Sequence, residues 1–210
     1  LGNSMFKGIS FDPSTTGSFV VSYMDTSASE YAKAVVGIIS GTSITFGAEY
    51  VVYSGGTTTY NSVAFEPNTA GKCVVIYTTG TDQGAAVVGT VSGTNITFGS
   101  EYIFNPAQTT YMSIAFEPNT TGNFVVAYVD KINSYYGTAV VGTVSGTSIS
   151  YGSEIVLKNA GSNEAVVAFD PSNVGKFVVV YSVSSVSGTA IVGQIAATVT
   201  TTNLTTDNFL

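Results

Sequence analysis

Carboxylates recur through this 210-residue chain at positions where an oxygen-rich metal site could be built. One acid precedes a proline in each of four similar segments: Asp12, Glu66, Glu117 and Asp170. Such groups could bind Ca²⁺, but one carboxylate per segment does not gather the six or more oxygens that the ion prefers. Because each acid stands directly before a turn proline, we predict that it stabilises the turn and that the chain has no metal site.

A second set of acids recurs in three of the segments, as Glu49, Glu101 and Glu154. Glycoside hydrolysis needs two carboxylates roughly 5 to 9 Å apart, and nothing in the sequence brings two acids together. Charges on an outer strand discourage association between sheets, so we interpret this set as edge-strand residues. We therefore expect no catalytic residue and no enzyme activity.

Composition excludes several other chemistries. The chain has no His, and its six basic residues are all Lys against 13 acids, which gives a net charge of -7. Nucleic-acid binding needs a basic stripe that neutralises phosphates, so we expect no nucleic-acid partner. Cys73 lies within an apolar run, where we predict a buried small side chain. We expect no cofactor, and no apolar stretch approaches the roughly 20 residues that a membrane helix needs.

Tyrosines beside acids are the most promising ligand-binding residues. Tyrosine rings stack on sugars, and carboxylates accept hydrogen bonds from hydroxyls. An alternative for Tyr60 and Tyr111 is that they occupy matching positions and pack at the start of a strand. The candidate ligand-binding residues are Asp25, Tyr31, Tyr60, Asp82, Tyr111, Asp130, Tyr135 and Tyr136.

Internal repeats must position these residues. An aromatic residue, an acid and a proline follow one another four times, with the aromatic at Phe11, Phe65, Phe116 and Phe169. A run ending in Tyr23, Tyr77, Tyr128 and Tyr181 recurs in phase. The repeating unit is about 50 residues long, a period typical of propeller blades and other repeat architectures.

Each unit is predicted to contain four short strands, which we label a, b, c and d. In the second unit they fall near 62–65, 73–77, 86–91 and 96–104, where β-branched and aromatic residues are concentrated. Tight turns with Pro and Gly connect a to b and c to d. The b–c loops and d–a links differ among units, and the alternation of strand direction places them together at one end. Variable loops on a rigid scaffold are a usual place for recognition.

The predicted fold is all-β: four tandem four-stranded antiparallel units, arranged like the blades of a β-propeller. Apolar runs in strands b and c indicate that both sheet faces are covered. Small residues in strand c, such as Gly37 and Gly89, are expected to let neighbouring units approach. A linear stack of the same sheets is the alternative. The predicted repeat domain covers 1–197, with units 1–60, 61–111, 112–164 and 165–197, and 198–210 is a Thr-rich strand or a linker to a further domain.

The phrase from Gly137 to Glu154 closely resembles a tandem repeat in virion proteins of marine bacteriophages, including tail-fibre-like proteins. The segment from Thr200 to Leu210 is similar to the one that follows the last repeat in such proteins. The resemblance covers essentially the whole chain and implies the C-terminal end of a repeat array. It implies no catalytic residues.

Two functions follow as hypotheses. The first is a virion-surface or extracellular module that recognises a host-surface glycan or protein through the b–c and d–a loops. The second is a structural fibre subunit, with other virion subunits or further copies of the same chain as partners, in which residues 198–210 complete a neighbouring chain's sheet. The last unit lacks the strand-d motif of the others, so its fourth strand comes either from the C-terminal segment or from elsewhere.

Overall fold

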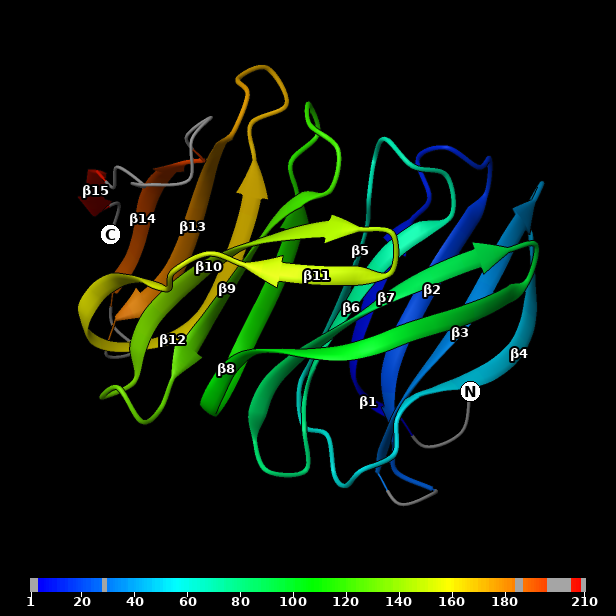
Figure 1. Cartoon of the computed structure of the whole chain (residues 1–210), viewed down its shortest axis with the longest axis horizontal. Coiled ribbons are helices and arrows are strands. Elements are labelled where there is room, and N and C mark those ends of the chain that lie inside the picture. Colours follow the sequence, from blue (N-terminus) through cyan, green and yellow to red (C-terminus); the bar gives the residue numbers. More distant parts are fainter. Residues whose placement is uncertain (1–3, 28–29, 184–186, 196–204, 209–210) are drawn as a thin grey trace.

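The computed structural model describes residues 4–27, 30–183, 187–195 and 205–208, and these form antiparallel β-strands without a helix. Figure 1 shows the strands following one another across the molecule, with the first four on one side and β13–β15 on the other. The all-β prediction is confirmed. The strands follow the β-branched and aromatic runs, and they end where Gly, Pro and Asn begin the turns.

Four four-stranded units are present, as predicted. Unit 1 comprises β1 (Ser4–Phe11), β2 (Ser18–Asp25), β3 (Tyr31–Ser40) and β4 (Ser43–Tyr53). Unit 2 comprises β5 (Asn61–Phe65), β6 (Lys72–Thr78), β7 (Gln83–Ser92) and the first part of β8 (Asn95–Phe116). Unit 3 comprises the rest of β8, β9 (Asn123–Asp130), β10 (Tyr136–Ser145), and β11 (Ser148–Tyr151) with the first part of β12 (Ile155–Phe169). Unit 4 comprises the rest of β12, β13 (Lys176–Val183), β14 (Ser187–Gln194) and β15 (Thr205–Asn208).

Two d–a links that were expected to be loops are continuous strand. β8 pairs with β7 as far as Gln108 and with β9 from Thr109 onward. β12 likewise changes partner between Gly161 and Ser162. Units 2 to 4 therefore form one 11-stranded sheet, whereas unit 1 is a separate 4-stranded sheet. Bulges at the partner changes let one strand bend from one sheet into the next.

The fourth strand of unit 4 comes from the chain's own C-terminal segment. Thr205–Asn208 pairs antiparallel with β14, from Thr189 opposite Asn208 to Val192 opposite Thr205. This register answers the question that the missing strand-d motif left open. The rest of the predicted Thr-rich segment, 198–204 and 209–210, lies outside the described residues.

The hydrophobic core is divided among the three joints between successive units. One cluster joins Val20 and Val36 of unit 1 to Phe65 and Tyr77 of unit 2. Another cluster joins Val125 and Leu157 of unit 3 to Phe177 and Tyr181 of unit 4. Units 2 and 3 thus bury one face against the unit before and the other against the unit after, as the apolar b and c strands predicted, whereas units 1 and 4 each bury one face.

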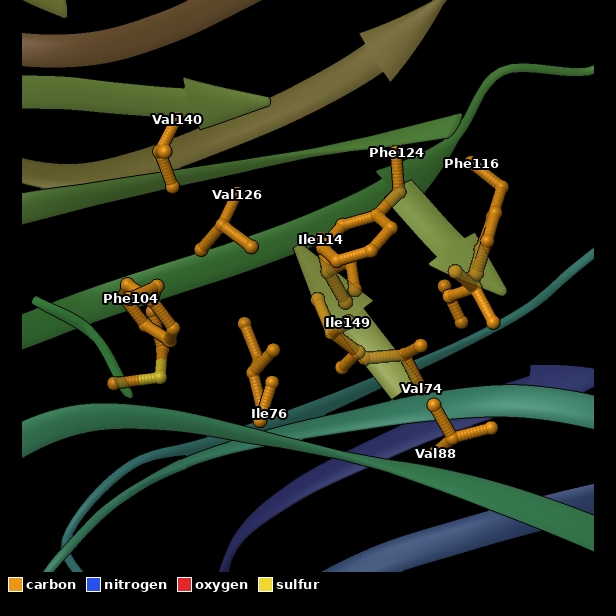
Figure 2. Packing of buried hydrophobic residues seen from close by; sticks show 14 of the residues in the cluster. Val74, Ile76, Val88, Phe104, Ile114, Phe116, Phe124, Val126, Val140 and Ile149 are labelled. Carbon is orange, nitrogen blue, oxygen red and sulfur yellow. The ribbon is translucent and has the colours of Figure 1, made fainter. Parts of the chain in front are cut away.

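The joint between units 2 and 3 illustrates this packing. Figure 2 shows Val74, Ile76 and Val88 of unit 2 facing residues of unit 3 that include Ile114, Phe124 and Ile149. The aliphatic side chains come from the face of unit 2 that points toward the next unit. Phe104, on the first part of β8, adds an aromatic ring from unit 2. The first three strands of unit 2 thus contribute aliphatic side chains, whereas unit 3 contributes both aliphatic and aromatic ones.

The recurring carboxylates link the units in addition to shaping their turns. Asp12 accepts hydrogen bonds from the Ser14 N–H (2.9 Å) in its own turn and from the Gly71 N–H (3.0 Å) in the turn of the next unit. Glu117 does the same with the Asn119 N–H (3.1 Å) and the Gly175 N–H (3.3 Å). The predicted turn role is confirmed. The bond to the next unit was not predicted, because it depends on how the units are placed.

Strand-c glycines make room within a unit. A Cβ added at Gly37 would lie 2.2 Å from Phe19 Cζ, and one at Gly142 would lie 2.1 Å from Phe124 Cζ. In both cases the ring belongs to strand b of the same unit. The expectation that these small residues admit the neighbouring unit is therefore wrong for Gly37, because the aromatic ring on the adjacent strand fills the space.

Candidate functional site

The described parts of the b–c loops and d–a links lie together at one end of the units, which we call the loop end (26–27, 30, 54–60, 79–82, 105–111, 131–135 and 159–164). Backbone hydrogen bonds join them: Thr58 N–H to Glu30 O (3.1 Å), Thr109 N–H to Asp82 O (2.9 Å) and Ser162 N–H to Tyr135 O (2.8 Å). The a–b turns lie at the opposite end, along the upper side of Figure 1. The prediction of one uniform and one diverse end is confirmed.

Strained backbone is concentrated at the loop end. Every described non-glycine residue with positive φ lies there: Glu30, Asp82, Tyr111, Ser134, Tyr135 and Glu164. At the opposite end, positive φ is carried by glycines such as Gly17 and Gly71. A side chain in the left-handed region costs free energy, and such residues persist in clusters where ligands are held.

Tyr60 and Tyr111 lie against each other at the start of consecutive a strands. Their ring centroids are 5.2 Å apart at an interplanar angle of 57°. Burial and the neighbouring Tyr111 raise the pKa of Tyr60. Both side chains remain partly exposed. The alternative interpretation, that these matching residues pack, is therefore correct as far as the contact goes.

Glu164 occupies the position of Tyr60 and Tyr111 in the next unit. It lies five residues before Phe169, as Tyr111 lies five residues before Phe116. Its side chain is exposed, its φ is 54°, and its strand β12 packs against β8. The row of a strands therefore presents two phenols followed by one carboxylate. Glu164 was not among the predicted ligand-binding residues, although its spacing from Phe169 in the repeat aligns it with the two tyrosines.

The other candidate tyrosines also lie at the loop end. Tyr135 is 51% exposed and precedes strand β10. Tyr31 and Tyr136 are the first residues of β3 and β10, and both are partly exposed. All five candidate tyrosines are thus accessible from one end of the molecule.

Two of the candidate acids are occupied in shaping their own loops. Asp25, which is buried, accepts hydrogen bonds from the Ser27 N–H (2.9 Å) and Oγ (2.6 Å) and from Lys33 Nζ (2.5 Å). Asp130 accepts from the N–H groups of Ile132 (3.1 Å) and Asn133 (3.3 Å). Both are Asx turns, in which the carboxylate holds the backbone of its own loop.

Asp82 differs from these two acids. It is partly exposed, it has a φ of 63°, and its Oδ2 accepts a hydrogen bond from Gln108 Nε2 at 2.8 Å. This side-chain bond joins a b–c loop to a d–a link. Asp82 therefore remains with the tyrosines as a residue at the loop-end surface.

The second set of acids satisfies buried tyrosines. Tyr77 Oη donates to Glu101 (2.7 Å), and Tyr128 Oη donates to Glu154 (2.7 Å). Burial, together with these carboxylates, raises the pKa of both phenols. Both acids are exposed, as predicted; Glu101 lies on β8 and Glu154 lies between β11 and β12. Each pairs a polar group that would be costly to bury alone. Tyr77 and Glu101 also line an open groove of about 400 Å³ beside Tyr53 of unit 1.

The described part of the chain shows neither a metal site nor a reactive thiol. Within it, no three His, Cys, Asp or Glu side chains gather in a way that could hold a metal ion. Cys73 is fully buried, which raises the pKa of its thiol to about 12. Among the same residues no helix is long and apolar enough to cross a membrane.

Comparison with known proteins finds similarity to solved structures alone. No protein-family model and no curated protein matches the chain. Among solved structures, it is similar to Sqt1 from Saccharomyces cerevisiae (TM-score 0.58, 11% identity), covering 92% of this chain and 48% of that one. It is also similar to an exo-β-1,3-galactanase from Phanerochaete chrysosporium solved with β-1,3-galactotriose (0.58, 10% identity), covering 99% and 51%.

A third similar structure is a mutant of AofleA from Arthrobotrys oligospora, with a TM-score of 0.59 and 12% identity over 97% of this chain and 57% of that one. At these identities the likeness is one of fold. The chain spans about half the length of the structures it matches.

Proposed function

We propose that this protein is a non-enzymatic recognition module whose loop end binds a glycan on a host surface. The observation that carries the proposal is the concentration of strained non-glycine backbone at that end, where Tyr111, Tyr135 and Glu164 are held in the left-handed region. Strain of this kind is retained where the surrounding structure fixes side chains for a purpose.

The side chains suit a saccharide. The Tyr60–Tyr111 pair offers a rigid aromatic surface, on which the apolar face of a sugar ring can stack. Glu164 on the next a strand, with Asp82 in the neighbouring loop, supplies oxygen acceptors for hydroxyl groups. The similarity to a galactanase solved with a galactotriose supports a carbohydrate ligand at the level of the fold.

We further propose that the units are blades of a propeller-type arrangement within a bacteriophage tail fibre or another virion-surface protein. Three features support this: the period of about 50 residues, the four antiparallel strands per unit, and the contact of each a strand with the next. The resemblance of residues 137–154 to marine phage repeats gives the virion context. The location is accordingly the virion surface or the extracellular space.

The fibre-subunit alternative gains less support. It required the C-terminal segment to complete the sheet of another chain, whereas Thr205–Asn208 pairs with β14 of its own unit. Assembly through the exposed apolar faces of units 1 and 4 is a separate proposal.

The test is binding to an array of bacterial surface polysaccharides that also carries β-1,3-galactotriose. We expect the wild-type chain to bind at least one glycan, and Tyr111→Ala to weaken that binding about tenfold, or about 1.4 kcal/mol, because the stacking surface is lost. Tyr50→Ala is the matched control, since Tyr50 is a partly exposed tyrosine on strand β4 that hydrogen bonds to Asn95.

Equal weakening by Tyr50→Ala and Tyr111→Ala would contradict the proposed site. Absence of binding by the wild-type chain to every glycan on the array would contradict glycan recognition itself.

A further inference from the structure

The two end units leave different apolar faces uncovered. The head face, on unit 1, consists of Ile9, Phe11, Ile44 and Phe46. Ile9 is 61% exposed and Phe11 53% exposed, whereas their counterparts in unit 2, Val63 and Phe65, are buried against unit 1. The head face is thus the surface that every later unit buries against its predecessor.

The tail face, on unit 4, consists of Val166, Ala168, Val180 and Val192. Val180 is 38% exposed, whereas its counterparts Ile76 and Ala127 are fully buried in the joints that follow units 2 and 3. The tail face therefore corresponds to the surface that units 2 and 3 bury against the unit after them, and the head face to the surface that units 2 to 4 bury against the unit before them.

The polar groups of a joint are also present at the two ends. In the three internal joints, Asp12, Glu66 and Glu117 accept from the N–H groups of Gly71 (3.0 Å), Gly122 (3.2 Å) and Gly175 (3.3 Å). Asp170 continues this series on the tail face, and it bonds to Ser172 N–H and Asn173 Nδ2 within its own turn. Gly17, with a φ of 74°, stands where the donor glycines stand in later units.

We propose that the tail face of one chain packs on the head face of a second copy, and that two copies close into one ring of eight units. The proposal extends the joint already made three times within the chain, so it needs no new kind of contact. A head-to-tail interface forms rings when the rotation closes and filaments when it does not. Two copies match the size of the similar structures, of which one chain spans about half. The inference does not depend on glycan binding.

The experiment is light scattering coupled to size-exclusion chromatography of the whole chain over a range of concentrations. We expect a mass twice that of the 21.6 kDa monomer. Ile9→Asp on the head face and Val180→Asp on the tail face should each give the monomer mass, because a carboxylate would be buried in the joint. An equimolar mixture of the two variants should recover the doubled mass, because one intact head face then meets one intact tail face.

Ile132→Asp is the matched control, since Ile132 is 74% exposed but lies on neither end face, and it should keep the doubled mass. If Val180→Asp lowers the melting temperature, Val166→Asp, at a more exposed position of the same face, replaces it. A wild-type chain that is monomeric at all concentrations overturns the proposal. Loss of pairing by only one of the two variants also overturns it, because it indicates a symmetric contact. Open polymers overturn the two-copy ring.

Discussion

Asp25 illustrates how an acid in a variable loop can be committed to the loop itself. Hydrogen bonds from Lys33 and then Ser27 lower the pKa of Asp25 from 3.8 to about 2. A lowered pKa in the folded state contributes stability that is fully present above the unfolded value and is lost as the pH falls through the folded value.

We therefore expect Asp25→Asn to lower the melting temperature at pH 7, and the difference from wild type to shrink between pH 4 and pH 2. Thermal unfolding followed by circular dichroism across that pH range measures the effect. Glu164→Gln, at an exposed position, serves as the comparison and should show no such convergence. A gap for Asp25→Asn that stays constant down to pH 2 would show that the Lys33 contact does not depend on the charge of Asp25.

At this scale the sequence predicted the role of some residues better than others. The turn role of Asp12 and Glu117 could be read from the following proline, because an Asx-type turn is a local structure. The same turn chemistry at Asp25 and Asp130 was not predicted, since no proline marks those turns. The repeat spacing showed that Tyr60 and Tyr111 occupy matching positions. It did not predict their contact, which depends on how units 2 and 3 pack against each other.

Within a single unit, the pairing of a glycine with an aromatic ring on the adjacent strand sets the packing of strands b and c. We expect Gly142→Ala to lower the free energy of unfolding by about 1–3 kcal/mol, because its Cβ would overlap the Phe124 ring. Urea unfolding measures the change. Gly161→Ala is the control, since a Cβ there meets nothing within 4 Å, and its effect should be close to zero or slightly stabilising. Equal losses in the two variants would mean that overlap with the Phe124 ring does not set the cost.

Strand positions could be predicted from sequence, whereas strand continuity could not. β5, β6 and β7 lie close to the expected ranges, because β-branched runs and turn residues determine them locally. β8 and β12 run through segments that contain Pro106, Asn105 and Asn159, which favour loops. They continue because Tyr111 and Glu164 adopt the left-handed conformation at a bulge, which their residue types do not signal.

Across the whole molecule, we expect the buried carboxylates at the joints to contribute more to the unfolding free energy than Asp170, the last of the recurring acids. Burial raises the pKa of Glu117, but hydrogen bonds from Thr120, Asn119 and Gly175 outweigh it, so the pKa is lowered overall. Glu117→Ala should cost about 1.5–3 kcal/mol of unfolding free energy, as expected for hydrogen bonds to a charged group. Asp170→Ala, in a turn at the tail face, should cost less in the monomer.

Urea unfolding of both variants at a concentration where the chain is monomeric makes this comparison. The matched positions share the same turn motif, so a difference reports the bond to the next unit. Equal losses of unfolding free energy would mean that the acid stabilises only its own turn and that its bond to the next unit contributes nothing. The number and order of the units could be predicted from the repeats, but which faces stay uncovered became visible only in three dimensions.

The continuity of β8 and β12 also determines how this molecule would come apart. A tension applied along the chain passes directly from unit 2 through unit 4 along two unbroken strands. It reaches unit 1 through the link 54–60, the apolar joint and hydrogen bonds such as that from Gly71 N–H to Asp12. Unit 1 is therefore the piece that can detach as a whole, leaving a three-unit remainder. That remainder would display Val63 and Phe65 in place of Ile9 and Phe11, so a shortened array would still carry a head face.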